Sequence, residues 1–161
     1  MPMLRRSQAI AGLAALCVAV LPVSGALAAP PAKHLPTNPT KLANLRGQQL
    51  VHKFFVLLRT DDNHALANFL APGFQIQRAT GTHLNKRQYL AKHSKVVSFR
   101  ISNLHVTSAP HLIITTYNVM ARQYIDGVIY KQTPQARLSV FEQIRGQWYI
   151  VAHAFFSTPA A

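Results

Sequence analysis

Cysteine and acidic residues are what this 161-residue chain has least of. It contains one cysteine, Cys17, and four acidic residues, Asp61, Asp62, Asp126 and Glu142, against 17 lysines and arginines. One cysteine excludes an internal disulfide and a thiolate metal site. With only four carboxylates, the chain has few residues that could form the pair of acids on which many hydrolases and lyases depend. The excess of positive charge predicts attraction to anionic partners and is no guide to the fold.

The first 28 residues have the organisation of a secretory signal peptide. Arg5 and Arg6 give a basic start, residues 9–23 form an apolar stretch, and residues 26–28 read Ala-Leu-Ala, a small-x-small cleavage site. A transmembrane anchor needs about 20 predominantly apolar residues, so this stretch is short for one. We expect cleavage near Ala28, a periplasmic or secreted mature protein, no stable membrane anchor, and loss of the cysteine with the signal.

The rest of the chain divides into a leader and one domain. Residues 29–39 hold four prolines and predict a mobile, extended leader, and residues 40–157 suit a single domain. Apolar residues at helical spacing up to Leu58 predict a long helix capped by Thr40. A second helix, capped by Asp62 or Asn63, is expected to end at the Pro-Gly pair 72–73, and Asn85 can cap a third.

Strand patterns fill the second half of the domain. Alternating apolar residues predict a strand over 97–106 with a bulge near 102–103, a second over 112–125, a third over 128–144 interrupted at Pro134, and a last one over 148–156. The Asp-Gly pair 126–127 and the Arg-Gly pair 145–146 predict the turns. The expected fold class is α+β, with three N-terminal helices and then a four-stranded antiparallel meander.

Both faces of the last strand are apolar. Trp148, Ile150 and Ala152 belong to one row, and Tyr149 and Val151 to the other. A strand with one solvated face is polar on that side. Since three short helices can cover one face of the sheet, the other face predicts a homodimer through the sheet. The alternative is an ordinary sheet face with scattered exposed aromatics.

A family resemblance follows from this order of elements. The long N-terminal helix, the run ALANFLAPGF at 65–74, and the strand segments RLSVFE at 137–142 and WYIVAHA at 148–154 resemble the nuclear transport factor 2-like superfamily, which includes SnoaL-like cyclases and ketosteroid isomerases. The resemblance implies a cone-shaped fold in which the helices pack on a curved sheet, a cavity between the two, and usually dimers. It implies fold rather than function, because this fold hosts many activities.

The acids do not supply the base that enzymes of this superfamily use. In the isomerases a catalytic Asp lies where Gln75, Gln77 and Arg78 occur here. Asp61 and Asp62 are explained as helix caps and Asp126 as a turn residue. Glu142 shares strand parity with Leu138 and Val140, which would place it inside, with Arg137 on the opposite face. The alternative is that the Glu142 carboxylate lies near the strand end and forms an ion pair with a nearby arginine or lysine.

His153 on the last strand is the second catalytic candidate, as an acid, base or ligand contact. A histidine satisfied within the core or an interface is the more common case. The other histidines of the domain show no HxH or HExxH spacing, so no metal site is expected. No cofactor is expected either.

Polar residues placed to line the predicted cavity are the candidate ligand contacts. They are Gln77, Arg78, Tyr89, Tyr117 and Arg137. A basic patch near the third helix offers a different kind of site, and its members are Lys86, Arg87, Lys92, Lys95 and Arg100. Such a patch attracts anionic lipid head groups, acidic glycans or small anions, or simply maintains solubility. Nucleic acid is disfavoured by the expected compartment and by the lack of an aromatic-interleaved motif.

The sequence therefore predicts an exported domain without catalysis that holds a small or anionic ligand in the cavity between helices and sheet. A cofactor-free lyase or isomerase using His153 or Glu142 is one alternative. An interaction protein that docks through its basic patch is the other.

Overall fold

The long N-terminal helix predicted from the sequence is present. The computed structural model describes residues 38–125, 128–130 and 133–156. The expected signal peptide, leader residues 29–37, the Asp126-Gly127 turn and Ser157 lie outside the described residues. Helix α1 spans Pro39–Thr60, and Asn38 caps it by accepting a 2.9 Å hydrogen bond from the Thr40 amide. The prediction of Thr40 as the cap was wrong, because Pro39, which lacks an N–H, occupies the first helical position.

The two short helices begin where their caps predict. Helix α2 spans Asn63–Phe69 and is capped by Asp62, and helix α3 spans Lys86–Ala91 with a complete capping box from Asn85 and Gln88. Helix α2 ends earlier than predicted, because Leu70 already has extended dihedrals and starts a strand that contains the Pro-Gly pair.

Seven strands form one sheet in the order β2-β1-β7-β6-β4-β3, with β5 paired to β4. Their bounds are β1 Leu70–Gln77, β2 His83–Asn85, β3 Lys95–Ala109, β4 Leu112–Ile125, β5 Val128–Tyr130, β6 Gln135–Ile144 and β7 Gln147–Phe155. The predicted meander is confirmed in β3, β4, β6 and β7, which pair antiparallel. Strand β1 pairs parallel with β7, so the sheet is mixed and not the purely antiparallel meander expected from the sequence.

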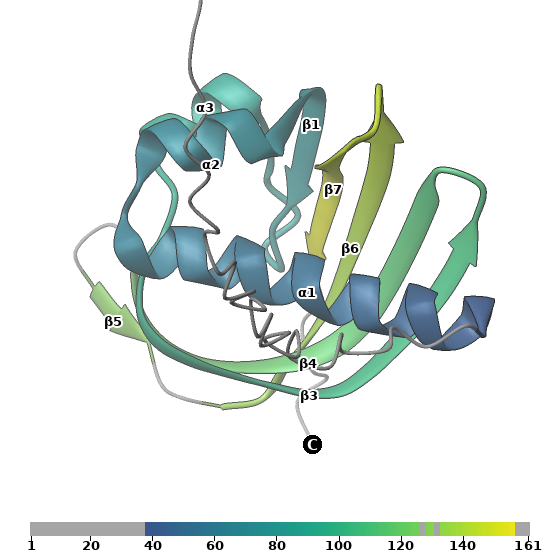
Figure 1. The fold of residues 1–161 in the computed structure, drawn as a ribbon. Coiled ribbons are helices and arrows are strands. Elements are labelled where there is room, and N and C mark those ends of the chain that lie inside the picture. The colour runs from purple at the N-terminus through teal and green to yellow at the C-terminus, as the bar shows by residue number, and fades with distance from the viewer. Residues whose placement is uncertain (1–37, 126–127, 131–132, 157–161) are drawn as a thin grey trace, which may run out of the picture. The chain divides into compact units, whose positions relative to one another are not determined.

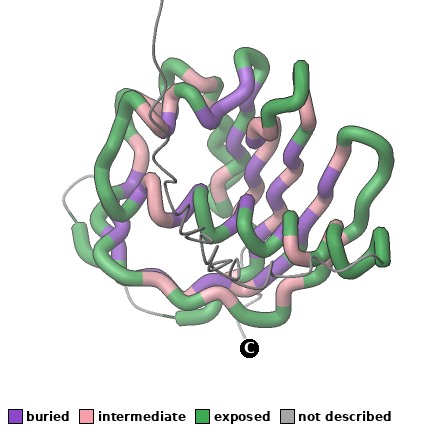
Figure 2. The backbone as a smooth tube through the Cα atoms, in the orientation of Figure 1, coloured by how far each residue is buried: buried purple, intermediate pink, exposed green. Residues whose placement is uncertain are grey.

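The core lies between α1 and the face of the sheet that α1 covers. Figure 1 shows β3 and β4 curving beneath α1, while α2 and α3 lie beside β1. The predicted apolar stripe of α1 is buried, with Val51 and Phe54 at 0% and 1% exposure. Figure 2 shows buried positions concentrated on the side of each element that faces this interior. No helix in the described ranges is long and apolar enough to cross a membrane.

A bulge in β7 decides which side chains enter the core. Phe141 pairs with Ile150, but the next β6 residue, Val140, pairs with Ala152, so Val151 is the extra residue. Ile150 and His153 therefore both point inward, although they are three residues apart and would lie on opposite faces of a regular strand.

The inward row of β6 is Arg137, Ser139 and Phe141, all buried. Glu142 is exposed on the outer face together with Leu138 and Val140, which are half-buried. The expectation that Glu142 points inward and Arg137 outward was therefore wrong. Arg137 can occupy the inner row because its guanidinium is hydrogen-bonded to Ala136 and Gln135 and stacks on the Phe155 ring.

Candidate functional site

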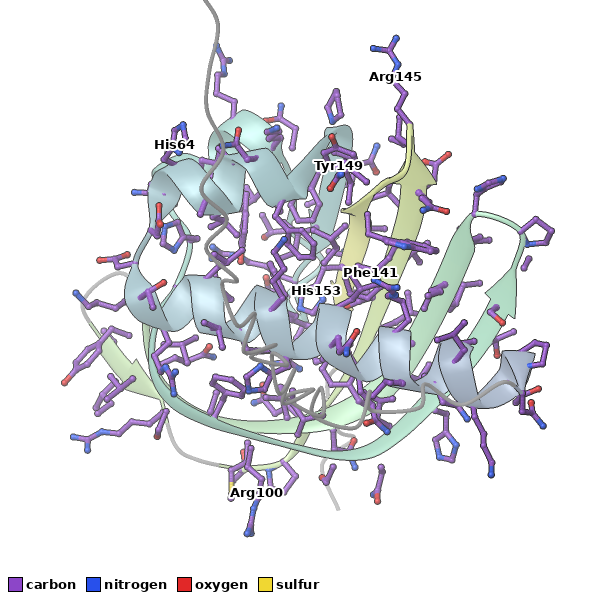
Figure 3. The ribbon with its side chains drawn as sticks, viewed as in Figure 1. His64, Arg100, Phe141, Arg145, Tyr149 and His153 are labelled. Carbon is purple, nitrogen blue, oxygen red and sulfur yellow. The ribbon has the colours of Figure 1, made fainter. Side chains whose placement is uncertain are left out.

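Three polar side chains from adjacent strands form a connected network inside the core. The Oγ atom of Ser139 on β6 lies 2.8 Å from Nδ1 of His153 on β7 and 2.9 Å from the hydroxyl of Tyr117 on β4. Ser139, Tyr117 and His153 are 0%, 2% and 3% exposed. The His153 ring also packs edge-on against Phe54 of α1 and against Phe155. Figure 3 shows His153 and Phe141 on the side of the sheet that faces α1.

Burial keeps the titratable members of this network neutral. It lowers the pKa of His153 to about 3, and the positive charge of Arg137 acts in the same direction against a small opposing effect of a backbone hydrogen bond with Leu138. Burial raises the pKa of Tyr117, although its hydrogen bond to Ser139 and the charge of Arg137 partly oppose the rise. At neutral pH the network therefore contains an uncharged imidazole and an uncharged phenol.

Arg137 is the charged member of this interior. Its Nη1 donates a 2.9 Å hydrogen bond to the Ala136 carbonyl, and its Nη2 donates to the Gln135 side chain. Its guanidinium lies 3.8 Å from the centre of the Phe155 ring, a cation–π contact. Burial lowers the pKa of Arg137 to about 10, so the group stays protonated at neutral pH.

The remaining candidates separate into different places. Tyr89 is buried on α3 against Phe74, and burial raises the pKa of its hydroxyl. The Gln77 side chain donates to the Gly81 carbonyl at 2.7 Å, and Arg78 donates to the Lys92 carbonyl at 3.1 Å. Gln77 thus fastens the turn after β1, Arg78 ties the end of β1 to the end of α3, and neither joins the interior network.

The network has the residue types of a nucleophile and a base but lacks access to solvent. Ser139 and His153 are in hydrogen-bond contact, as a serine nucleophile and its base would be. Yet neither they nor Tyr89, Tyr117 and Arg137 line the surface concavities of the described residues that are considered next. Sequence reasoning missed Ser139, whose place in the inward row of β6 becomes evident only once the strand parity is known. The network joins three strands of the core, and its three members are buried away from these concavities.

Open concavities occur at the surface instead. A groove of about 820 Å³ runs along α1 beside β3 and is bordered largely by amide and apolar side chains. Three further concavities adjoin one another where α2, α3, β1 and the β6–β7 turn meet, and we call them together the rim groove. Their volumes are about 340, 580 and 550 Å³. The first and second share Asn68, Gln147 and Tyr149, and the second and third share Pro72 and Lys86.

Positive side chains are found in every part of the rim groove. Lys53 lines the first concavity, Lys86 and Arg145 the second, and Lys86 and Arg87 the third. No carboxylate of the described chain lines any of the three. Figure 3 shows Arg145 extending from the tip of the β6–β7 turn, with His64 on α2 and Tyr149 below the tip.

The predicted basic patch is divided by the fold. Lys86 and Arg87 lie on α3 and belong to the rim groove. Lys95 forms an ion pair with Asp61 at 3.2 Å, and Lys92 is exposed at the end of α3. Arg100 projects from the far end of the molecule, away from α3 (Figure 3). The cations that join Lys86 and Arg87 come instead from α1 and the β6–β7 turn, far away in sequence.

Clusters of metal-ligating side chains are absent from the described ranges. These ranges contain no group of three or more His, Cys, Asp or Glu side chains that could hold an ion. His93 lies 2.6 Å from the Asn63 side chain and 3.9 Å from Asp61, which joins α3 to the start of α2.

Comparisons with known proteins identify the fold. No family model and no curated protein matches the chain. Solved structures do. A nuclear transport factor 2-like protein from Cytophaga hutchinsonii has a TM-score of 0.64 and 12% identity, covering 69% of this chain and 94% of its own. One of unknown function in nutrient uptake, from Rhodospirillum rubrum, has a TM-score of 0.62 and 17% identity, covering 69% and 97%.

A third similar structure carries the name of an enzyme. It is a proposed scytalone dehydratase from Novosphingobium aromaticivorans, with a TM-score of 0.58, 12% identity, and coverage of 74% of this chain and 87% of its own. At such identities the similarity establishes architecture and no activity. Together with helices packed on a curved, mostly antiparallel sheet, these matches show that the chain has the nuclear transport factor 2-like fold.

Proposed function

We propose that this protein is an exported domain without catalysis that binds an anionic ligand in the rim groove. The observation that carries the proposal is a set of cations, Lys53, Lys86, Arg87 and Arg145, around connected concavities with no carboxylate among their described lining. Both ion pairs of the described residues involve Asp61, so none of these four is neutralised by a described acid. A groove with charge of one sign concentrates ligands of the opposite sign.

Lys86 is the most firmly placed of the four. Its ammonium donates a 2.8 Å hydrogen bond to the Leu70 carbonyl, which holds it between the second and third concavities. An ammonium has three donors, so further hydrogen bonds remain for a ligand. A cation held in position loses less conformational entropy when it binds an anion.

The acids of the chain argue against carboxylate-based catalysis at this groove. Asp62 caps α2 through a 2.9 Å hydrogen bond from the Ala65 amide, and Asp61 pairs with Lys95. Glu142 lies directly opposite Tyr149 on the neighbouring strand, exposed on the outer face of the sheet, and it lines none of the three concavities. General acid–base catalysis needs a positioned proton carrier within hydrogen-bond reach of the substrate. The signal peptide predicted from residues 1–28 supports a role outside the cytoplasm.

The single tryptophan of the chain makes the proposal testable. Trp148 lines the first concavity, so its fluorescence reports on occupancy of the groove. A panel of anions, comprising citrate, polyphosphate and oligogalacturonate, is titrated into the mature protein. The Arg87→Glu/Arg145→Glu variant should bind at least about tenfold more weakly, since each reversal changes a contact worth roughly 1 kcal/mol at the surface.

The control variant is Lys41→Glu/Arg100→Glu, which makes the same change in net charge at exposed positions outside the groove. Its affinity should stay within about twofold of the unmodified protein, and both variants should keep the thermal stability. The proposal fails if no anion changes the fluorescence, or if the two variants weaken binding equally.

A further inference from the structure

We infer that the ligand of the rim groove is a chain of acidic sugars rather than a compact anion. This inference rests on the proposed function, since it names the class of ligand that the same groove would take. It depends on three properties of the groove: the spread of its cations, its aromatic side chains and its amide groups.

The cations are distributed along the groove. Lys53 belongs to the first concavity, Arg145 to the second, Arg87 to the third, and Lys86 to the boundary between the last two. A compact anion contacts one such cluster and leaves the others without a counter-charge. A polymer with one carboxylate or sulfate per repeat presents a negative charge to each concavity in turn, so the spread of charge fits an extended ligand.

The aromatic side chains supply surfaces for sugar rings. Trp148 and Tyr149 both line the first concavity, and Tyr149 also lines the second. Both are partly exposed, so a ligand can reach their rings. Tyr and Trp offer large amphipathic contact surfaces at low conformational cost, and the apolar C–H face of a sugar ring packs against such a surface.

Amide side chains complete the match to hydroxyl-rich rings. Asn68 and Gln147 line both the first and second concavities, and Asn85 lines the third. The Asn85 side-chain oxygen is used to cap α3, which leaves its amide donors for a ligand. Amides both donate and accept, as sugar hydroxyls do, whereas a polyphosphate needs donors alone.

Single-stranded nucleic acid fits the groove less well. Proteins that bind it stack successive bases on successive aromatic side chains along a basic channel. Here the two partly exposed aromatics are neighbours on β7 at one end of the groove, and Lys86 and Arg87 at the other end are accompanied by Pro72 and Leu90. That arrangement gives one place for ring packing, followed by charge and hydrogen bonding.

The test is a length series of oligogalacturonates, from the monomer to the octamer, titrated into the mature protein and followed by Trp148 fluorescence. Affinity should rise at least tenfold from dimer to hexamer and then level off once the groove is filled. The methyl-esterified hexamer, which has the same rings without charge, should bind at least tenfold more weakly. Polyphosphate and oligo-dT of equal charge are the comparison polyanions.

The Tyr149→Ala variant separates sugar recognition from charge. It should weaken the hexagalacturonate at least fivefold and leave polyphosphate binding within twofold, with the thermal midpoint as a check on folding. The inference is overturned if polyphosphate or oligo-dT binds as tightly as the hexamer, or if Tyr149→Ala affects all polyanions alike. Those results would leave the proposed function standing. If no anion binds through Arg87 and Arg145, both fail.

Discussion

Ser139 Oγ lies 2.8 Å from His153 Nδ1 in a site from which solvent is excluded. The same oxygen lies 2.9 Å from the Tyr117 hydroxyl, so one serine serves two buried partners on the neighbouring strands. A buried polar group costs little when it is hydrogen-bonded and much when it loses its partner. The network therefore stabilises one arrangement of β4, β6 and β7, and its stability must depend on the charge of His153.

Lowering the pH should destabilise the protein through His153. Its pKa is about 3 in the folded state against 6.5 in the unfolded chain. Between these values the unfolded chain binds the extra proton, so the free energy of unfolding falls as the pH falls from about 6.5 towards 3. The slope attributable to this group reaches at most about 1.4 kcal/mol per pH unit. Urea unfolding at pH 7, 5.5 and 4.5 measures it.

His153→Gln is the matched control for this pH dependence. An amide keeps a hydrogen-bonding group for Ser139 but does not titrate, so the variant should show a shallower loss of stability over the same pH range. Equal slopes in the two proteins would mean that His153 is accessible to protons in the folded state.

Removing Ser139 should cost more than removing the hydroxyl of Tyr117. Ser139→Ala leaves both the Tyr117 hydroxyl and the His153 Nδ1 without their shared partner, whereas Tyr117→Phe leaves Ser139 still bonded to His153. Each abandoned buried polar group costs about 1–3 kcal/mol. Chemical denaturation of both single variants and the double variant measures the order and the coupling. A larger loss for Tyr117→Phe would contradict the network as described.

Local signals in the sequence were sufficient for most elements of the fold. Asp62 and Asn85 place the starts of α2 and α3, because a side chain that accepts from the first free amides marks a helix start. The turn at Arg145-Gly146, where both residues have positive φ, also follows from local chemistry. The parallel pairing of β1 with β7 could not be predicted in this way, because it joins segments about 80 residues apart.

The candidate site was harder to predict, because side-chain direction depends on parity. The additional residue Val151 in β7 changes the face of every residue after it, and no local pattern distinguishes it from its neighbours. On β6, the apolar side chains of Leu138 and Val140 suggested that their row points inward. The inward row is instead the one that contains Arg137, whose guanidinium contacts the Ala136 carbonyl and the Phe155 ring. The rim groove assembles Lys53, Lys86 and Arg145 from three distant segments, which only the tertiary structure reveals.

Gly47 should resist substitution despite its place in a helix. A Cβ at this position would lie 2.7 Å from Val106 Cγ2, closer than real Cβ atoms come, and 3.0 Å from Val106 Cγ1. Overpacking of this kind costs about 1–3 kcal/mol, which exceeds or offsets the roughly 1 kcal/mol that alanine gains over glycine in a helix. Gly47→Ala should therefore leave the thermal midpoint unchanged or lower it.

The decisive comparison places Gly47→Ala in a Val106→Ala background. Without the branched side chain the two shortest contacts disappear and only the 3.3 Å contact with Thr115 Cγ2 remains, so the helix propensity of alanine should now raise the midpoint. If Gly47→Ala has the same effect in both backgrounds, close packing of α1 on β3 is not the reason for glycine.

The outer face of the sheet predicts a homodimer. Ile114, Val140 and Ala152 lie directly opposite one another across β4, β6 and β7, and all three are half-buried in the single chain on the face that α1 does not cover. An apolar row at the centre of a sheet face is typical of a surface that a second subunit covers. We expect light scattering after size-exclusion chromatography to give twice the mass of the mature chain.

Val140→Glu should convert that dimer to a monomer. An unpaired carboxylate at the centre of the contact would cost several kcal/mol, so the dissociation constant should rise at least about 100-fold. Gln48→Glu, which adds the same charge at an exposed position on α1, should leave the mass unchanged. Two results would reject this interface: a monomer in the unmodified protein, or a Val140→Glu protein that stays dimeric and folded.

Because the rim groove lies at the end of the sheet, dissociation of the dimer should leave the response of Trp148 fluorescence to anions intact.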